Sequence, residues 1–504
     1  MISTPFRRAP GDIELLGHHR LFIHGEATPS RSGRTFTSIN PTSGQPLAEV
    51  DEGDATDIDR AVESSVAALA GEWGHVSGAR RGVILWELAD LVQEHLDELV
   101  RLDGLDAGKP IRDGRAIDGP AAVSLLRYFA GVADKIRGSH IPVPNFLNYT
   151  SLEPHGVVGA IIPWNYPLYN AVLKAAPALA CGNAVVLKPA AQTPLSALEF
   201  GALGQKAGLP PGALNVVPGF GRSAGARLVS HPDVRKIAFT GSTDVGKQIM
   251  RSAADHMKSL TLELGGKGPN IIFPDADLDE AVAGCLYSVF RNQGQTCTAG
   301  TRVLIHASTA ADFVEQVTTG GRALTVGDPL DPATRLGPLV SAKQLDRVRR
   351  YIASGLQEGA ELVSGGTPPA DPNLQSGFFL QPTVFTNVGA HMRIAQEEIF
   401  GPVVTVLTFT DEDDAVDKAN DVAYGLSAAI WTRDIRKAHR VADRLEAGTV
   451  WINTIHAGAP GSPSGGFKLS GIGVEKGLEA IREYTRLKSV WVGLDEHPIG
   501  WARA

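Results

Sequence analysis

Short apolar runs alternate with longer segments of helical periodicity from residue 157 to residue 263. This alternation predicts right-handed βαβ units on a parallel sheet. A sheet of this kind binds its ligands at the carboxyl ends of its strands. The apolar runs are VVGAII (157–162), AVVL (184–187), LNVV (214–217), KIAF (236–239) and LTLEL (260–264).

A second alternating series runs from NIIF (270–273) to VWIN (450–453), with strands expected at 303–305 and 403–409. The first ~130 residues differ, because a strand-like sequence is followed there by amphipathic helical patterns. We assign no chemistry to these helices. The apolar positions of these patterns are Ile58, Val62, Val66 and Leu69, and then Ile84, Leu88, Leu91 and Leu99.

Two further segments predict a small strand-built appendage. Residues 141–153 are extended and contain proline, and KSVWVG (488–493) is a late strand candidate. Edge strands of this kind can pair with a partner chain, so we expect an oligomerisation element. The whole pattern therefore predicts two α/β domains with a small β appendage.

Composition places the chain among globular proteins. Of 504 residues, 43% are hydrophobic and 20% are charged, and the net charge of −8 argues against a nucleic acid or an anionic membrane as the main partner. Three cysteines cannot form a disulfide framework, which favours a reducing compartment. The first 30 residues show no signal-like apolar region, and no run of 18 apolar residues occurs. We expect a soluble, cytoplasmic protein.

An anion site is predicted at FTGSTDVG (239–246), which follows a strand and opens a helix. Free backbone N–H groups and the Ser242 hydroxyl could hold a pyrophosphate there. An ordinary helix cap at Ser242 or Thr243 is the alternative. The glycines at 219, 221 and 225 miss the usual dinucleotide spacing by one residue and carry little weight alone.

Cys297 is the unusual cysteine of the chain. It lies in the polar, glycine-flanked stretch NQGQTCTAG (292–300), whereas Cys181 and Cys285 have apolar neighbours. A thiol in a polar loop can ionise and attack a carbonyl. The residues alone leave open that Cys297 is inert.

Two further side chains could assist such a thiol. Glu263 ends a buried strand before two glycines, so its pKa should be raised and it could act as a general base. Pairing with Lys267 or with a backbone N–H is the alternative. Asn165 lies in the turn PWNYP (163–167), where two prolines could aim its amide as an oxyanion donor, unless the turn is merely rigid.

Taken in order, seven segments resemble the aldehyde dehydrogenase superfamily, and within it the NAD(P)-dependent, non-acylating, betaine-aldehyde-like branch of broad substrate range. The resemblance covers nearly the whole chain. The segments are PWNYP (163–167), LKPAAQTP (187–194), FTGSTDVG (239–246), LELGGK (262–267), GQTC (294–297), EEIFGPV (397–403) and PSGGFKLSGIG (463–473).

The resemblance implies an aldehyde dehydrogenase-like α/β fold with two open parallel domains. Residues 1–131 and 155–263 would form a Rossmann-like dinucleotide-binding domain, and residues 264–470 the catalytic domain. Residues 132–154 and 480–504 would form the β oligomerisation element of a homodimer or homotetramer.

The resemblance also implies the chemistry. Cys297 would attack the aldehyde, with the oxyanion held by the Asn165 amide and the Cys297 backbone N–H. The thiohemiacetal would pass a hydride to the nicotinamide, and Glu263 would activate the water that hydrolyses the resulting thioester to a carboxylic acid. Lys174 and Glu475 match positions tied to proton movement. No metal is implied.

For the cofactor, the resemblance implies that Lys188 bonds the adenosine ribose, Ser242 the pyrophosphate and Glu398 the nicotinamide ribose. Relatives that prefer NAD often carry Glu where this chain has Ala191, so either NAD or NADP is expected and NADP should be tolerated. The other residues implied at the dinucleotide site are Trp164, Gly225, Phe239, Gly241, Gly265 and Phe400.

A substrate pocket is implied as well, and it could be wide or polar because Ser464 stands where an aromatic residue is common. It would accept aromatic, aliphatic or amino-aldehydes. Two alternatives remain: a coenzyme A-acylating relative, against which Glu263 argues, and a silent dinucleotide-binding structural protein. The residues implied at the pocket are Tyr166, Tyr169, Asn170, Thr296, Thr298, His456 and Ser464.

Overall fold

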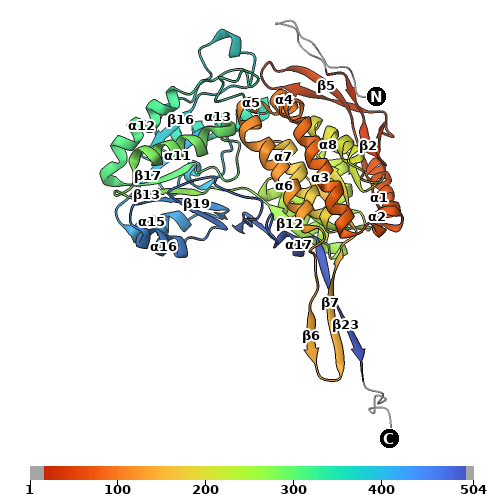
Figure 1. Cartoon of the computed structure of the whole chain (residues 1–504). Coiled ribbons are helices and arrows are strands. Elements are labelled where there is room, and N and C mark those ends of the chain that lie inside the picture. The colour runs from red at the N-terminus through yellow and green to blue at the C-terminus, as the bar shows by residue number, and fades with distance from the viewer. Residues whose placement is uncertain (1–15, 495–504) are drawn as a thin grey trace.

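The computed structural model describes residues 16–494, which form two α/β bodies and a projecting β arm (Figure 1). The predicted α/β class with parallel sheets is confirmed. Residues 1–15 of the predicted cofactor domain and residues 495–504 of the predicted oligomerisation element lie outside the described residues. Within the described part, no helix is both long and apolar enough to span a bilayer.

The first body contains an eight-stranded sheet in the order β22-β12-β11-β8-β9-β10-β2-β3. Strands β12 to β10 of this order pair in parallel, and every residue of β8 and β9 is buried, as expected for a sheet covered on both faces. The strands are β2 (Leu21–Ile23), β3 (Glu26–Thr28), β8 (Val157–Ile161), β9 (Ala184–Lys188), β10 (Leu214–Val216), β11 (Val234–Thr240), β12 (Ser259–Glu263) and β22 (Gly471–Ile472).

Helices cover both faces of this sheet, with α3, α4, α6, α7 and α8 over one apolar core and α1, α9 and α10 over the other. A separate three-stranded sheet contains β1 (His18–His19), β4 (Thr35–Asn40) and β5 (Gln45–Asp51). The helices are α1 (Ala55–Ala70), α2 (Glu72–His75), α3 (Gly78–Glu94), α4 (Leu96–Ala107), α5 (Ile111–Asp113), α6 (Gly119–Val132), α7 (Pro167–Ala180), α8 (Leu195–Lys206), α9 (Ala226–Ser230) and α10 (Thr243–Ala253), with short π segments at Gly114–Asp118 and Gly221–Gly225 and a 3₁₀ turn at Ala254–His256.

One helical prediction was wrong in its extent. The pattern from Ile84 to Leu99 belongs to two helices, because α3 ends at Glu94 and α4 begins at Leu96. His95 between them leaves the helical conformation, with φ −96° and ψ 13°. Its ring nitrogen Nδ1 lies 2.9 Å from the Leu91 carbonyl oxygen, which closes the end of α3.

The second body is built on a seven-stranded sheet in the order β15-β16-β17-β14-β13-β19-β20, parallel except for β15. Apolar clusters fill both of its faces. Its strands are β13 (Pro269–Ile272), β14 (Arg302–His306), β15 (Glu361–Ser364), β16 (Thr383–Thr386), β17 (Val403–Phe409), β19 (Ser427–Trp431) and β20 (Thr449–Ile452), and its helices are α11 (Leu278–Phe290), α12 (Ala310–Arg322), α13 (Ala342–Gln357), α14 (Arg393–Gln396), α15 (Glu412–Asn420) and α16 (Ile435–Arg444). The short elements are 3₁₀ turns at Arg291–Gly294, Ala307–Thr309 and Pro372–Leu374, and the two-stranded pair β18 (Tyr424–Gly425) and β21 (Phe467–Lys468).

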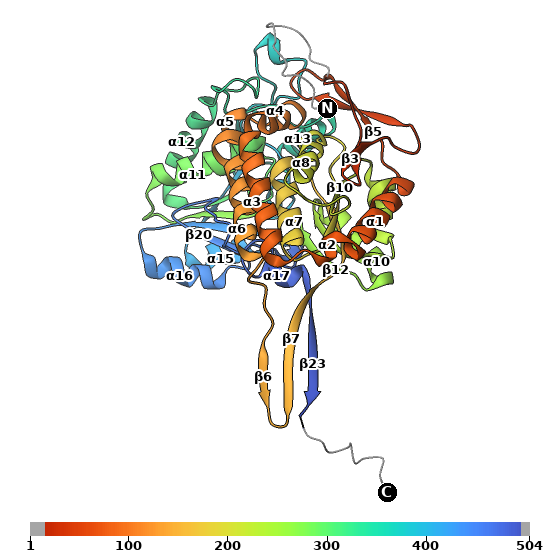
Figure 2. The same cartoon turned by 45° about the vertical axis from the view of Figure 1, so that its right-hand side comes forward.

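The chain then returns to the first body. Strand β22 pairs antiparallel with β12, and α17 (Ala480–Glu483) contributes Ala480 and Ile481 to the core of that body, so the appendage predicted to start at 480 begins structurally at β23. Strands β6 (His140–Val143), β7 (Phe146–Pro154) and β23 (Thr485–Gly493) form an antiparallel arm that extends away from both bodies (Figure 1, Figure 2).

Candidate active site

Cys297 lies in the loop that joins the 3₁₀ turn Arg291–Gly294 to β14, at the junction of the two bodies. Left-handed backbone at Asn292 and Gln293, with φ of 51° and 58°, turns the chain away from α11. The carbonyl of Gln295 accepts hydrogen bonds from the side-chain amides of Asn165 at 2.9 Å and Asn292 at 3.2 Å. The loop before the thiol is therefore fixed by amide donors.

Asn165 approaches this loop from the turn after β8, as predicted. Asn292 Nδ2 donates to the Asn165 backbone oxygen at 3.0 Å, which ties the turn to the cysteine loop. The Asn165 amide has two N–H groups, of which the Gln295 carbonyl takes one. A second donor is left that could serve an oxyanion.

Glu263 ends β12, and the glycines that follow it lie directly against the cysteine loop. A Cβ at Gly266 would stand 2.3 Å from the Cys297 carbonyl oxygen, a contact that only glycine permits. Glu263 Oε1 is buried and has no hydrogen-bond partner among the described residues, nor has the buried Nζ of Lys267. The alternative in which this oxygen pairs with Lys267 or a backbone N–H is therefore wrong.

Burial sets the proton affinities at this site. Desolvation raises the pKa of Glu263 well above its ordinary value, and the charge of Glu475 adds to the effect. Desolvation also raises the pKa of Cys297 to about 12, with contributions from Glu398 and Glu263. Cys297 remains partly accessible. In the free protein it is a protonated, reachable thiol flanked by two carboxyl groups.

Lys174 and Glu475 form a buried ion pair close to Glu263. Lys174 comes from α7 and is fully buried, while Glu475 follows β22. Lys174 lowers the pKa of Glu263, and Glu475 raises it. The structure thus brings these predicted residues together as one charge cluster.

Lys188 ends β9 near the glycine turn of the first body. Its Nζ donates to the carbonyls of Pro189 at 2.7 Å and Gly219 at 2.9 Å, and burial lowers its pKa to about 8. A Cβ at Gly225 would lie 3.5 Å from Lys188 Cε, so the two predicted residues are neighbours. Ala191 lies in the turn after β9 and is half-buried.

Ser242 stands at the N-terminus of α10, where within the described structure its side chain makes no capping hydrogen bond. Ser242 is thus the N-cap residue of α10, but its hydroxyl does not cap the helix. Thr243 Oγ1 instead donates to the Leu469 carbonyl at 3.3 Å. A Cβ at Gly241 would stand 2.4 Å from the Phe239 ring, so this glycine lets the ring lie against the turn.

Glu398 lies beside the glycines after β12. The Gly266 N–H donates to its Oε1 at 3.0 Å, and a Cβ at Gly265 would stand 2.6 Å from its Oε2. Burial raises the pKa of Glu398 to about 7. Phe400, which has φ 62°, packs edge-on against Trp164 with ring centroids 5.2 Å apart.

Residues predicted for the substrate pocket contact Thr296 and Thr298, the two chain neighbours of Cys297. A hydrogen bond of 2.8 Å joins Tyr166 and Thr296 through their hydroxyls. His456 Nε2 donates to the Thr298 carbonyl at 3.1 Å, and its ring is 3.3 Å from the Thr298 hydroxyl. The ring of Tyr169 packs edge-on against that of Tyr166, with ring centroids 6.5 Å apart.

Two predicted pocket residues have other polar contacts. Asn170 Nδ2 donates back to the Tyr166 carbonyl at 3.0 Å within α7. Ser464 pairs with the backbone of Glu475, and its hydroxyl donates to the Glu475 carbonyl at 3.4 Å. The Ser464 hydroxyl and one N–H of the Asn170 amide are thus used inside the protein.

Sequence reasoning missed the charged group around Tyr166. Lys109 Nζ lies 3.5 Å from the centre of the Tyr166 ring, and Arg291 and Asp118 adjoin it. Of these residues, only Arg291 had a recognisable sequence feature, because it is a charged residue at the end of the apolar helix before Cys297. Lys109 and Asp118 are distant in sequence and carried none.

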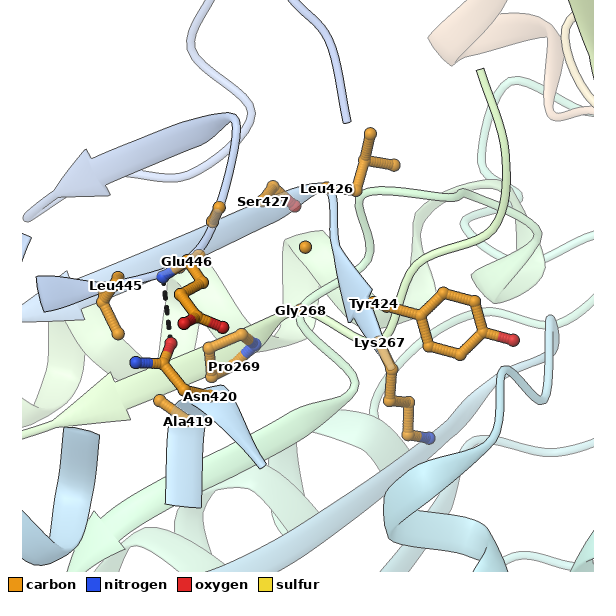
Figure 3. A pocket seen from close by; sticks show the side chains of 13 residues that line it. Lys267, Gly268, Pro269, Ala419, Asn420, Tyr424, Leu426, Ser427, Leu445 and Glu446 are labelled. Atoms are coloured by element: carbon orange, nitrogen blue, oxygen red, sulfur yellow. Dashed lines mark hydrogen bonds between the residues drawn. The ribbon is translucent and has the colours of Figure 1, made fainter. Parts of the chain in front are cut away.

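A separate small pocket lies between β13, β18, β19 and the chain after α15 and α16. Figure 3 shows Lys267 beside Tyr424, across the pocket from Glu446. The Glu446 N–H donates to Asn420 at 2.9 Å. None of the residues predicted for catalysis lines this pocket. Residues 16–494 contain no cluster of three or more potential metal ligands.

Comparisons with known proteins agree with this architecture. The model of the aldehyde dehydrogenase family matches residues 28–490. The mouse protein named retinal dehydrogenase 2 is 47% identical over 98% of this chain and 96% of its own length. The protein therefore belongs to the aldehyde dehydrogenase family.

Solved structures of this family superpose closely. An NAD⁺ complex of aldehyde dehydrogenase from Bacillus cereus is 46% identical, has a TM-score of 0.93, and is matched over 95% of this chain and 97% of its own. An NAD⁺ complex of betaine aldehyde dehydrogenase from Staphylococcus aureus is 39% identical with a TM-score of 0.94, over 96% and 97%. The predicted aldehyde dehydrogenase-like fold is confirmed.

The raised pKa of Cys297 predicts a pH-dependent reactivity of the free protein. Below that pKa the thiolate fraction grows with pH, so alkylation by iodoacetamide should accelerate about tenfold per pH unit between about pH 7 and pH 9. Peptide mass spectrometry after timed quenching measures the rate. Cys181 and Cys285 are internal controls, because both are buried and should stay unmodified. A rate that levels off near the ordinary thiol pKa of about 8.5 would contradict the prediction.

Proposed function

We propose that this protein oxidises an aldehyde to a carboxylic acid, with Cys297 as the nucleophile and Glu263 as the base that activates water. The observation that carries the proposal is the buried Glu263 oxygen without a partner among the described residues, close enough to Cys297 to raise the pKa of its thiol. An unpaired buried carboxyl of raised pKa can take a proton from water. It also favours hydrolysis over transfer of the acyl group to coenzyme A.

The residues at the cofactor end fit a nicotinamide dinucleotide. The uncapped Ser242 and the first N–H groups of α10 could hold the pyrophosphate, Lys188 the adenosine ribose, and Glu398 the nicotinamide ribose. Trp164, Phe239, Gly241, Gly265 and Phe400 would shape the cradle around it. Similar proteins have been solved with NAD⁺. When bound, the nicotinamide supplies the two-electron acceptor for the oxidation.

The chain's own groups account for the other steps. Glu263 would take the thiol proton as the Cys297 sulfur adds to the carbonyl and would pass it to the Lys174–Glu475 pair. The Asn165 N–H left free by Gln295 and the Cys297 backbone N–H would hold the oxyanion formed in this step. Glu263 would then deprotonate the water that cleaves the thioester. Lys174 and Glu475, the ion pair beside Glu263, would carry that proton onward.

Substitution of the two reacting side chains tests the proposal. Cys297→Ser should abolish aldehyde-dependent reduction of NAD, followed at 340 nm. Glu263→Gln should slow turnover at least about 100-fold and let an acylated Cys297 accumulate, visible as a mass increase of the intact protein.

Glu361→Gln, at an exposed carboxylate on β15, is the control and should behave as wild type. Turnover by Glu263→Gln at the wild-type rate, or acid formation without any adduct on Cys297, would refute the mechanism.

We propose further that NADP is accepted beside NAD. Ala191, in the turn after Lys188, has no carboxylate to repel a 2′-phosphate. Ala191→Glu should therefore lower the ratio of kcat/KM for NADP to that for NAD at least about tenfold. Steady-state kinetics with both cofactors measure the ratio, and a wild-type preference for NAD of about a thousandfold or more would contradict the idea.

We also propose that the arm joins copies of this chain in a homodimer or homotetramer. It exposes a set of large apolar side chains that water would otherwise cover. Its edge strand β6 offers unpaired backbone groups to a partner. The exposed members are Ile141, Phe146, Leu147, Tyr149, Leu487, Trp491 and Val492.

Charges on the arm should break this association. The double variant Leu487→Glu, Trp491→Glu alters one face of β23, because alternate residues of a strand share a face. Light scattering after size exclusion should show a smaller species than wild type. Leu356→Glu, at an exposed leucine on α13, is the control. An unchanged mass for the double variant would exclude the arm as the contact.

We propose the cytoplasm as the location, since none of the three cysteines, all within the described residues, is in a disulfide.

A further inference from the structure

Asn292 lies in the left-handed turn between α11 and the loop that carries Cys297. Its φ of 51° and ψ of 35° belong to a backbone conformation that asparagine and glycine adopt most readily. Glycine would meet this requirement without a side chain. Asn292 instead places an amide in the buried interior, where a polar group needs hydrogen-bond partners. The turn alone therefore does not account for the side chain at this position.

The Asn292 amide joins two segments of the site. Its Nδ2 donates to the Asn165 backbone oxygen at 3.0 Å and to the Gln295 carbonyl at 3.2 Å. A primary amide carries two N–H groups, so one is available for each carbonyl. The first carbonyl belongs to the turn after β8, and the second to the nucleophile loop. One side chain thus links the segment that holds the proposed oxyanion donor to the segment that holds the nucleophile.

These bonds close into a ring with the Asn165 side chain. The Gln295 carbonyl that accepts from Asn292 also accepts from Asn165 Nδ2 at 2.9 Å. Asn165 is therefore held at its backbone by Asn292 and at its amide by Gln295. All three residues are buried, where hydrogen bonds meet little competition from water. Because its backbone and one N–H are fixed, the remaining N–H of the planar Asn165 amide has a defined direction.

The Gln295 side chain gives the nucleophile loop further support. Its Oε1 accepts from the Val340 N–H at 3.0 Å, and its Nε2 donates to Gln293 Oε1 at 3.3 Å. These bonds do not involve the Asn292 side chain. Removal of the Asn292 amide would therefore act mainly on the Asn165 turn and less on the loop itself.

We propose that Asn292 is a positioning residue for the oxyanion site, which aims the second Asn165 N–H at the oxygen of the aldehyde attacked by Cys297. A donor stabilises a developing charge best when it is already in place, because no reorganisation is then needed during the reaction. Without Asn292, the Asn165 turn would have to be ordered in each turnover. This inference rests on the proposed aldehyde oxidation and assigns a residue that acts through Asn165.

The test deletes the amide and keeps the turn. Asn292→Gly retains a residue suited to the left-handed backbone, and Asn292→Asp retains the shape of the side chain but replaces its donor with an acceptor. The probe is propanal or benzaldehyde, whichever wild type oxidises faster, with the full-length enzyme and saturating NAD. Stopped-flow absorbance at 340 nm measures the first turnover, which covers attack by the thiol and the oxidation.

Both variants should lower the maximal first-turnover rate at least about 30-fold, since the oxyanion forms only after attack. The aldehyde concentration that gives half of this rate should change less than about threefold, because binding precedes the oxyanion. Alkylation of Cys297 by iodoacetamide should stay within about twofold of wild type, since this reaction needs the thiol but no oxyanion.

A double-mutant cycle with Asn165→Ala separates positioning from general loss of structure. If Asn292 acts through Asn165, adding Asn292→Gly to Asn165→Ala should cost less than about threefold in the first-turnover rate. Independent roles would instead multiply the two losses.

Gln293→Gly is the matched control. Gln293 is buried in the same left-handed turn, with φ 58°, and its Nε2 donates to the Gly108 carbonyl at 3.1 Å. The control therefore removes an equivalent buried amide that makes no bond to Asn165. It should keep a first-turnover rate within about threefold of wild type.

The outcomes separate this inference from the proposed function. Equal losses in Asn292→Gly and Gln293→Gly, or losses that multiply in the cycle, would overturn the positioning role and leave aldehyde oxidation standing. No oxidation of either aldehyde by wild type, with no adduct on Cys297, would overturn both. If Asn292→Gly fails to fold, Asn292→Asp takes its place in the comparison and in the cycle.

Discussion

The close approach of two backbones at Gly266 and Cys297 is the constraint on which the site depends. A single added Cβ at Gly266 would overlap the Cys297 carbonyl oxygen at 2.3 Å, and one at Gly265 would overlap the Glu398 carboxylate. These glycines let the end of β12 meet the cysteine loop and the chain before β17. Because side chains are absent at this point, three segments from two bodies converge on one small volume.

Convergence also explains the electrostatics. The carboxyl groups of Glu263 and Glu398 share a poorly solvated region with the Cys297 thiol, so the negative form of each of these three groups is disfavoured. The charge of Glu475 adds to the effect on Glu263. Lys174 compensates Glu475 directly. On the other side of the thiol the balance is reversed, since Arg291 and Lys109 share one aspartate. The site thus has an acidic side and a cationic side, separated by Cys297 and its neighbours.

Most of the framework could be predicted from sequence because buried parallel strands are continuous apolar runs, as in β8 and β9. The local sequence and the family resemblance were enough to predict Glu263, Asn165 and Cys297 as site residues. The structure brings these three residues together. The boundary between α3 and α4 could not, because His95 interrupts a pattern that remains periodic across it. Lys109 and Asp118 were also missed, since their contacts with Tyr166 and Arg291 join segments far apart in the chain and leave no local pattern. The roles of the site residues stay predictions.

The arm has a consequence for biosynthesis. Its middle strand β7 is completed by β23, and the side-chain amide of Asn148 donates to the carbonyl of Val490, 342 positions further along the chain. The ribosome must therefore release almost the entire polypeptide before this sheet can close. Until then Asn148 and its neighbours form only a two-stranded hairpin with β6, which is marginal in water on its own. Association through the arm would then be the last event in the maturation of each molecule, after both α/β bodies have had time to fold.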